Sequence, residues 1–202
     1  MKEEAKKPKS LRLKSAAKEI AYLALGVALM SVCAWITIPV GAIPVTLQTF
    51  AVALIGVLFG LVRGTVTVIV YLLMGLIGIP VFSHFNAGAA ALLGPTGGYI
   101  IGFLFEVAVG GAFSAIGIKN KIAKTAVLYP GMLLGLALLY FFGTLWFITV
   151  YSSGSEPIGV AAALMLCVVP YILPDAIKLF VAALLGVRLK PFLKLHKQKN
   201  PQ

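Results

Sequence analysis

The sequence predicts an all-α integral membrane protein, a single-domain bundle of six transmembrane helices. Three observations lead to this fold class: 60% of the 202 residues are apolar, only 11% are charged, and the mean hydropathy is +1.03. A membrane-crossing helix needs roughly 20 apolar residues, and the roughly 121 apolar residues of this chain suffice for six. A soluble domain, with roughly 25% charged residues, and a disordered chain are both excluded.

Proline, glycine and charged residues divide the chain into six apolar spans. A basic segment, residues 1–18, precedes the first span. The apolar run at 20–38 is longer than the core of a typical signal peptide and is followed by comparable spans, so we interpret it as a retained first helix. The first five predicted crossings are 19–38, 45–62, 64–82, 96–118 and 125–151.

The last apolar region, 157–187, is too long for one ordinary crossing. Pro170 and Pro174 interrupt it, and each removes a helical hydrogen bond. We therefore predict a short outer segment over 158–169 and a sixth crossing over 174–188. The membrane domain then covers 19–188 and is followed by a basic cytoplasmic tail, residues 189–202.

The distribution of basic residues predicts the orientation. With six crossings, both termini share one side of the membrane with the loops at Arg63 and at 119–124, and that side carries 16 of the 17 basic residues. The opposite loops carry none. Because basic loops stay in the cytoplasm, both termini are predicted to be cytoplasmic. The net charge of +11 therefore reflects orientation in a lipid bilayer, and no nucleic-acid partner is predicted.

Away from the span ends, charged residues occur in two spans, the fourth and the sixth. Lys178 is the one basic residue inside a span, where insertion costs roughly 2.5–3.5 kcal/mol at mid-bilayer. Asp175 lies three residues earlier, on the same helix face, and 13 residues before Arg188, or roughly 20 Å at helical rise. We interpret the pair as a polar site in the outer half of the membrane; the alternative is a structural ion pair. We interpret Glu106 as a protonated carboxyl hydrogen-bonded within the bundle.

The two outer loops after the first and third spans are apolar and carry uncharged polar and aromatic residues. Such loops favour folding over a mostly apolar ligand with a few hydrogen-bonding edges, although they could instead lie along the membrane surface. His84 has no second His or Cys at ligand spacing, so no metal site is predicted. The candidate binding residues in these loops are Gln48, His84, Phe85, Asn86 and Tyr99.

Other motifs are absent or structural. The sequence has no phosphate-binding loop of the ATPase type and no HExxH, CxxC or GxSxG motif. We interpret Cys33 and Cys167 as packing residues. Glycine pairs at helical spacing predict close helix packing inside the bundle, whereas Ala24 and Ala28 could face another subunit.

Five segments together resemble the BioY family, the biotin-specific substrate-binding subunits (S components) of energy-coupling-factor (ECF) vitamin transporters. The resemblance covers roughly residues 20–190. The segments are ALGVALMSVCAWI at 24–36, IPVTLQT at 43–49, GIPVF at 78–82, LGPTGGY at 93–99 and DAIK at 175–178.

The resemblance implies a six-helix S-component fold in a prokaryotic cell membrane, with biotin held near the outer face under the loops after the first and third helices. It implies three partners, a transmembrane coupling subunit and two ATP-binding subunits, with Ala24 and Ala28 meeting the coupling subunit. Many members have Pro-Gly-Asp before the sixth helix, where this chain has Leu173, Pro174 and Asp175.

Biotin has a ureido group, an apolar bicyclic ring and a carboxylate. Asp175, Asn86 and Gln48 can serve the ureido edge. Lys178 can neutralise Asp175, donate to the ureido carbonyl or pair with the ligand carboxylate. Aromatic candidates for the walls are Trp35, Phe85, Tyr99 and Tyr171.

The predicted function is high-affinity capture of biotin from outside the cell, with energy supplied by ATPases on other chains. The protein is not expected to be an enzyme or to carry a cofactor; biotin is bound as the substrate. The alternatives are an S component for riboflavin or thiamin, a membrane-embedded enzyme using Glu106, Asp175 and Lys178, and a proton-coupled carrier that acts alone.

Overall fold

The protein is almost entirely helical. The structure, a computed structural model, describes residues 9–39, 43–154 and 158–193. Helix α1 (Lys9–Trp35) leads into a small antiparallel hairpin, β1 (Thr37–Ile38) and β2 (Val45–Thr46), in which Thr37 pairs with Thr46. The remaining elements are α2 (Gln48–Leu76), the 3-10 turn η1 (Ser83–Phe85), α3 (Ala89–Leu93), α4 (Gly97–Ser114), α5 (Lys121–Gly154), α6 (Val160–Cys167) and α7 (Val169–Leu189).

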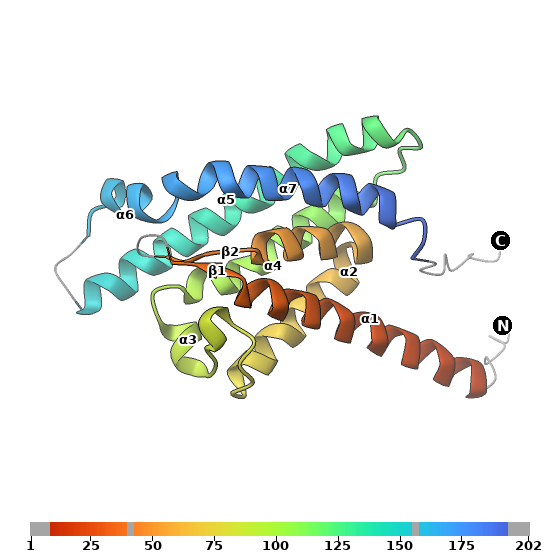
Figure 1. Ribbon diagram of the computed structural model, residues 1–202, viewed down its shortest axis with the longest axis horizontal. Helices are drawn as coiled ribbons and strands as arrows, with labels where there is room; N and C mark the ends of the chain where they lie inside the picture. Colours follow the sequence, from red (N-terminus) through yellow and green to blue (C-terminus); the bar gives the residue numbers. More distant parts are fainter. Residues whose placement is uncertain (1–8, 40–42, 155–157, 194–202) are drawn as a thin grey trace, which may run out of the picture.

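The long helices lie roughly along one axis of the molecule (Figure 1). The beginnings of α1 and α5 and the end of α7 lie at one end of the bundle. The β1–β2 hairpin and α6 lie toward the other end. This arrangement places the two outer loops of the sequence analysis, and the first turns of α2 and α4, on the side away from the basic residues.

Helix α2 reverses direction at Gly60. This residue has φ +78°, a left-handed backbone that glycine adopts without steric cost. A Cβ placed on Gly64 would lie 3.5 Å from the Cα of Gly56, so the segments on either side of Gly60 run back along each other. The sequence analysis placed this boundary at Arg63. Arg63 lies one turn further on, and its guanidinium bonds the Glu19 carboxylate of α1 at 2.6 Å.

Among the described residues, four helices are long and apolar enough to cross a membrane. They are Ala16–Trp35, Gln48–Leu76, Gly97–Ser114 and Lys121–Ser152, and the bent pair α6–α7 makes five if it is one span. The expectation that the last crossing begins at Pro174 is wrong. The chain bends by 43° between α6 and α7, at Val168, and Pro174 lies inside α7. Pro170 falls in the first turn of α7, where its missing N–H costs no helical hydrogen bond.

Close helix packing depends on glycines, as the sequence analysis predicts. A Cβ on Gly98 would come within 2.2 Å of Trp146, and one on Gly102 within 3.1 Å of Leu139. These contacts bring α4 and α5 together where the site lies. Cys33 and Cys167 are buried and unbridged, in agreement with their interpretation as packing residues.

Candidate substrate-binding site

A cavity lies between the β1–β2 hairpin, the first turns of α2 and α4, the middle of α5 and the α6–α7 bend. These elements come from four separate stretches of the sequence. The polar side chains on its walls include Thr46, Gln48, Thr49, Tyr99, Tyr140, Asp175 and Lys178. Of the residues predicted from the sequence, Gln48, Tyr99, Asp175 and Lys178 therefore meet in one cavity, together with the predicted wall residue Tyr171.

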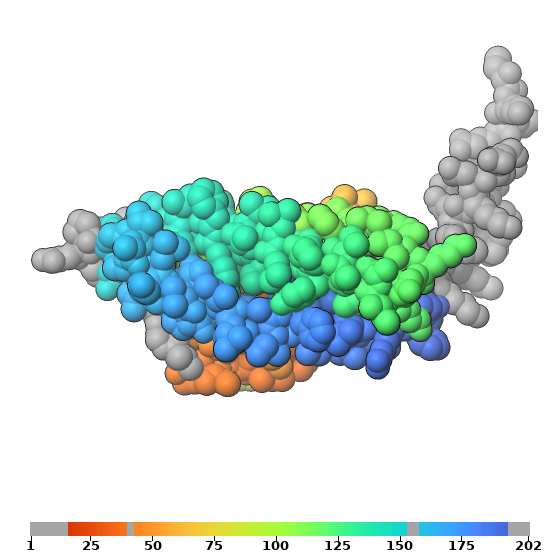
Figure 2. All heavy atoms as spheres, turned by 90° about the horizontal axis from the view of Figure 1, so that it is seen from above, coloured from red at the N-terminus to blue at the C-terminus, as the bar shows by residue number. Residues whose placement is uncertain are grey.

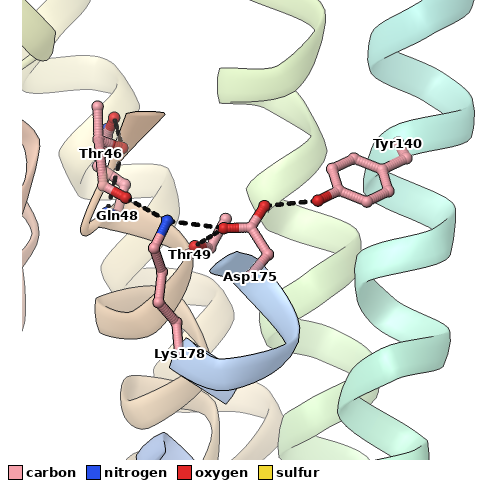
Figure 3. Close-up of polar contacts among 6 residues, drawn as sticks. All are labelled: Thr46, Gln48, Thr49, Tyr140, Asp175 and Lys178. Carbon is pink, nitrogen blue, oxygen red and sulfur yellow. Dashed lines mark hydrogen bonds and ion pairs between the residues drawn. The ribbon is translucent and has the colours of Figure 1, made fainter. Parts of the chain in front are cut away.

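Asp175 lies at the centre of the polar network (Figure 3). Asp175 is buried, and its carboxylate accepts three hydrogen bonds: from Thr49 Oγ1 at 2.9 Å, Tyr140 OH at 2.6 Å and Lys178 Nζ at 2.7 Å. Bonds to an ionised acceptor are roughly twice as strong as neutral ones. These three donors offset the cost of burying the carboxylate and fix its orientation at the cavity wall.

Lys178 connects α7 to the hairpin. Its ammonium donates to Asp175 and, at 2.6 Å, to the backbone carbonyl of Thr46 (Figure 3). The side chains of Lys178 and Asp175 are 13% and 7% exposed. An ammonium has three donors, and two are used by the described residues.

Gln48 and Tyr99 form hydrogen bonds with neighbouring side chains. Gln48 Nε2 donates to Tyr71 OH at 2.8 Å, and Tyr71 OH in turn donates to the Val81 carbonyl at 2.8 Å. Tyr99 OH and Thr144 Oγ1 lie 3.0 Å apart. These contacts orient Gln48 and Tyr99 at the cavity in the unliganded protein.

Phe85 and Asn86, which were predicted to contact the ligand, are not among the residues that line this cavity. Phe85 is 63% exposed and stacks on Trp35, with ring centroids 5.0 Å apart, and Trp35 Nε1 donates to the Pro80 carbonyl. Trp35 is therefore not a cavity wall either. Asn86 is exposed. The backbone of η1 turns through left-handed values at His84 and Phe85, φ 56° and 57°, and Ser83 lines the cavity from this loop.

The sequence analysis missed two donors to Asp175. Thr49 ends the IPVTLQT segment, one residue after Gln48, so its position beside a named candidate could have identified it. Tyr140 lies within the apolar run of the fifth span, where only the contact between α5 and α7 gives its hydroxyl a role. No local signal in the sequence marks it.

Glu106 is buried in α4 but lacks a hydrogen bond. It is 1% exposed, and neither carboxyl oxygen has a partner among the described residues. The interpretation of a carboxyl hydrogen-bonded within the bundle is therefore wrong, although its burial is confirmed. No group of three or more His, Cys, Asp or Glu side chains in the described part of the chain could hold a metal ion.

Ala24 and Ala28 are exposed on α1. They lie in an apolar surface groove of about 610 Å³, between α1 and the second half of α2, with Val70 and Met74 on the opposite wall. The groove is separate from the cavity of Asp175.

The fold and the cavity define a membrane protein built to bind a small molecule, in which several apolar helices surround a pocket with a buried Lys–Asp pair. The sequence profile of the BioY family matches residues 3–195. The chain belongs to the BioY family.

Two curated relatives and one solved structure illustrate the relationship. A protein of Pyrococcus horikoshii named probable biotin transporter BioY is 37% identical, over 86% of this chain and 97% of its own. A biotin transporter BioY of Thermotoga maritima is 39% identical, over 81% and 90%. A crystal structure of the S-component for biotin from an ECF-type ABC transporter superposes with a TM-score of 0.76 at 28% identity, covering 88% of this chain and 93% of that one.

Proposed function

We propose that this protein captures biotin with high affinity from outside the cell, as the substrate-specificity subunit of an ATP-driven ECF importer. The observation that carries the proposal is the Asp175–Lys178 pair, which lies on the wall of a cavity rather than against lipid. Membership of the BioY family and the likeness to a biotin S-component narrow the ligand to biotin. The protein is then a binding subunit and not an enzyme.

The proposed topology has six crossings: α1, the two halves of α2, α4, α5 and the α6–α7 pair. The reversal at Gly60 supports counting α2 twice. Both termini lie in the cytoplasm of a prokaryotic cell, because the basic residues gather at the end of the bundle where α1 and α5 begin and α7 ends. The cavity then faces outward.

The proposed partners are a transmembrane coupling subunit and two ATP-binding subunits. The chain has no phosphate-binding loop of its own, so the energy for release must come from other chains. Small residues let helix backbones approach closely, and the exposed Ala24 and Ala28 therefore suit contact with a helix of the coupling subunit.

The proposed biotin contacts are Gln48, Tyr99, Asp175 and Lys178, with Phe85 and Asn86 left out. The cavity contains about 70 Å³ of free space, which holds a few water molecules. A vitamin therefore needs wall side chains to move. We propose that Lys178 exchanges its bond to the Thr46 carbonyl for one to the ligand, at either the ureido carbonyl or the carboxylate. Asp175 remains held by Thr49 and Tyr140.

Calorimetry on the detergent-purified protein, freed of bound ligand, tests the proposal. Biotin should bind with 1:1 stoichiometry and be recovered unchanged, and riboflavin and thiamin should give no heat. Binding of riboflavin or thiamin in place of biotin would assign the protein to another vitamin. Chemical turnover of the ligand would mean an enzyme, and biotin uptake by cells that lack every coupling-factor subunit would mean a carrier that acts alone.

A further inference from the structure

A second pair of cavities lies at the opposite end of the bundle from Asp175. One is an apolar groove of about 490 Å³ between the first turns of α5 and the last turns of α7. The other, of about 320 Å³, lies beside it and is lined largely by lysines. Lys121 and Val187 line both, so the two are adjacent.

The groove is apolar and runs inward from a charged edge. Its α5 wall extends from Lys121 to Tyr129 and its α7 wall from Arg188 back to Phe180, each nine residues, with about 12 Å between the first and the last Cα along the helix axis. Thr125 donates its hydroxyl to the backbone carbonyl of Lys121, so it offers the groove no free donor. The Tyr129 and Phe180 rings both line the groove and meet edge to face, with centroids 5.6 Å apart.

The edge of the groove is strongly basic. We call Lys119, Lys121, Lys124, Arg188 and Lys190 the basic rim; all five line one of the two cavities. The described part of the chain has three acidic residues. Glu19 bonds Arg63, Asp175 bonds Lys178, and Glu106 is buried in α4. None of them forms an ion pair with the basic rim.

Lys190 is partly buried within the basic rim. Its ammonium donates to the Ser114 carbonyl and hydroxyl, at 3.1 and 3.0 Å. Burial, and secondarily the charge of Lys124, lower the pKa of Lys190 to about 8. An anion at the basic rim would relieve this repulsion.

The neighbouring helices form one outer face here. Figure 2 looks onto this face: α5 in green to teal and α7 in blue lie side by side along the molecule, with the residues near 121 and 188 at the same end. Ile122, 81% exposed, and Phe180, 47% exposed, present apolar surface beside the groove. In a bilayer such a face meets lipid.

We propose that the groove and the basic rim together bind one anionic glycerophospholipid. An acyl chain lies between α5 and α7, and the phosphodiester lies among Lys121, Lys124 and Arg188. The five basic residues of the rim form no ion pair with an acidic residue of the described chain. They therefore favour an anionic lipid over a zwitterionic one, since basic pockets between membrane helices attract anionic headgroups. The site is separate from the proposed biotin cavity and does not depend on what binds there.

Native mass spectrometry of the full-length protein tests this, with phosphatidylglycerol and phosphatidylcholine of identical acyl chains at equal concentration. The wild type should retain one phosphatidylglycerol preferentially. K121Q/R188Q should weaken phosphatidylglycerol binding at least tenfold and leave phosphatidylcholine binding unchanged. The matched control K14Q/K18Q removes the same charge from α1, which contributes no residue to either cavity, and should bind like the wild type. Equal retention of the two lipids by the wild type, or identical behaviour of the two double variants, would overturn the proposal.

A second pair of variants tests the acyl-chain part of the site. Ala126 lines the groove, and Val127, next to it on α5, does not. Ala126→Trp fills the groove and should abolish preferential retention of phosphatidylglycerol, whereas Val127→Trp should preserve it. Glycerol 3-phosphate has the phosphate charge but no acyl chain. If it displaces the lipid at millimolar concentration, or if Ala126→Trp behaves like the wild type, the rim binds free phosphate alone and the lipid proposal fails. Size-exclusion profiles and biotin affinity check that each variant is folded.

Discussion

Replacing Lys178 with methionine should weaken biotin binding at least tenfold while the protein stays folded. Lys178 makes two bonds in the unliganded site, to Asp175 at 2.7 Å and to the Thr46 carbonyl at 2.6 Å. A hydrogen bond from a charged group is worth about 1.5–3 kcal/mol. At about 1.4 kcal/mol for each factor of ten, loss of the bond to the ligand raises the Kd roughly 10- to 140-fold.

The same substitution should also lower the free energy of unfolding, and the contacts of Asp175 limit how much. Breaking a buried ion pair by removing one partner costs about 3–5 kcal/mol when the remaining charge is left uncompensated. Asp175 keeps the Thr49 and Tyr140 donors in Lys178→Met, so we expect a cost at or below the bottom of that range. The double variant Lys178→Met/Asp175→Asn removes both charges and should recover part of the lost stability.

Isothermal titration calorimetry measures the Kd, and thermal unfolding measures the stability of each variant. Lys119→Met is the matched control, because Lys119 is exposed and remote from the cavity, and it should bind like the wild type. A folded Lys178→Met protein with the wild-type Kd would remove Lys178 from the ligand site. The reasoning from cavity position to ligand contact would then be refuted.

Three further predictions concern other residues. Tyr140→Phe removes the donor 2.6 Å from Asp175 and should lower the free energy of unfolding by about 1.5–3 kcal/mol and raise the biotin Kd; an unchanged melting temperature would contradict this. Glu106→Met removes a buried carboxyl without partners and should raise the free energy of unfolding by about 1–3 kcal/mol with biotin affinity unchanged; loss of binding would instead give Glu106 a functional role. Ala24→Trp or Ala28→Trp should preserve biotin binding and prevent co-purification with the coupling subunit, and loss of biotin binding would mean that these alanines pack internally.

The helices were predictable because a helix that crosses a bilayer needs a long run of apolar residues, and such runs are easily seen in the sequence. Apolar runs located the helices, and glycine pairs such as Gly98 and Gly102 located close contacts. The boundaries were less predictable, since they depend on backbone conformation. The chain reverses at Gly60 rather than at Arg63, and α7 runs through Pro174, because only the local dihedral angles decide where a helix ends.

The site was predictable where a residue is unusual for its surroundings. A lysine in an apolar span needs a partner, and this physical cost identified Asp175 and Lys178. Tyr140 and Thr49 carry no such cost, so their bonds to Asp175 depend on how α2, α5 and α7 pack. Phe85 lies away from the cavity, because the turn of η1, with left-handed angles at His84 and Phe85, directs its ring onto Trp35, and no pattern in the sequence shows this turn.

The most direct test of the proposed function is an experimental structure of the protein with biotin bound. We expect the bicyclic ring of biotin in the cavity between the hairpin, α4, α5 and α7, with Lys178 Nζ within hydrogen-bonding distance of the ligand and no longer bonded to the Thr46 carbonyl. Biotin bound elsewhere, with Lys178 and Asp175 keeping only the protein partners described here, would contradict it.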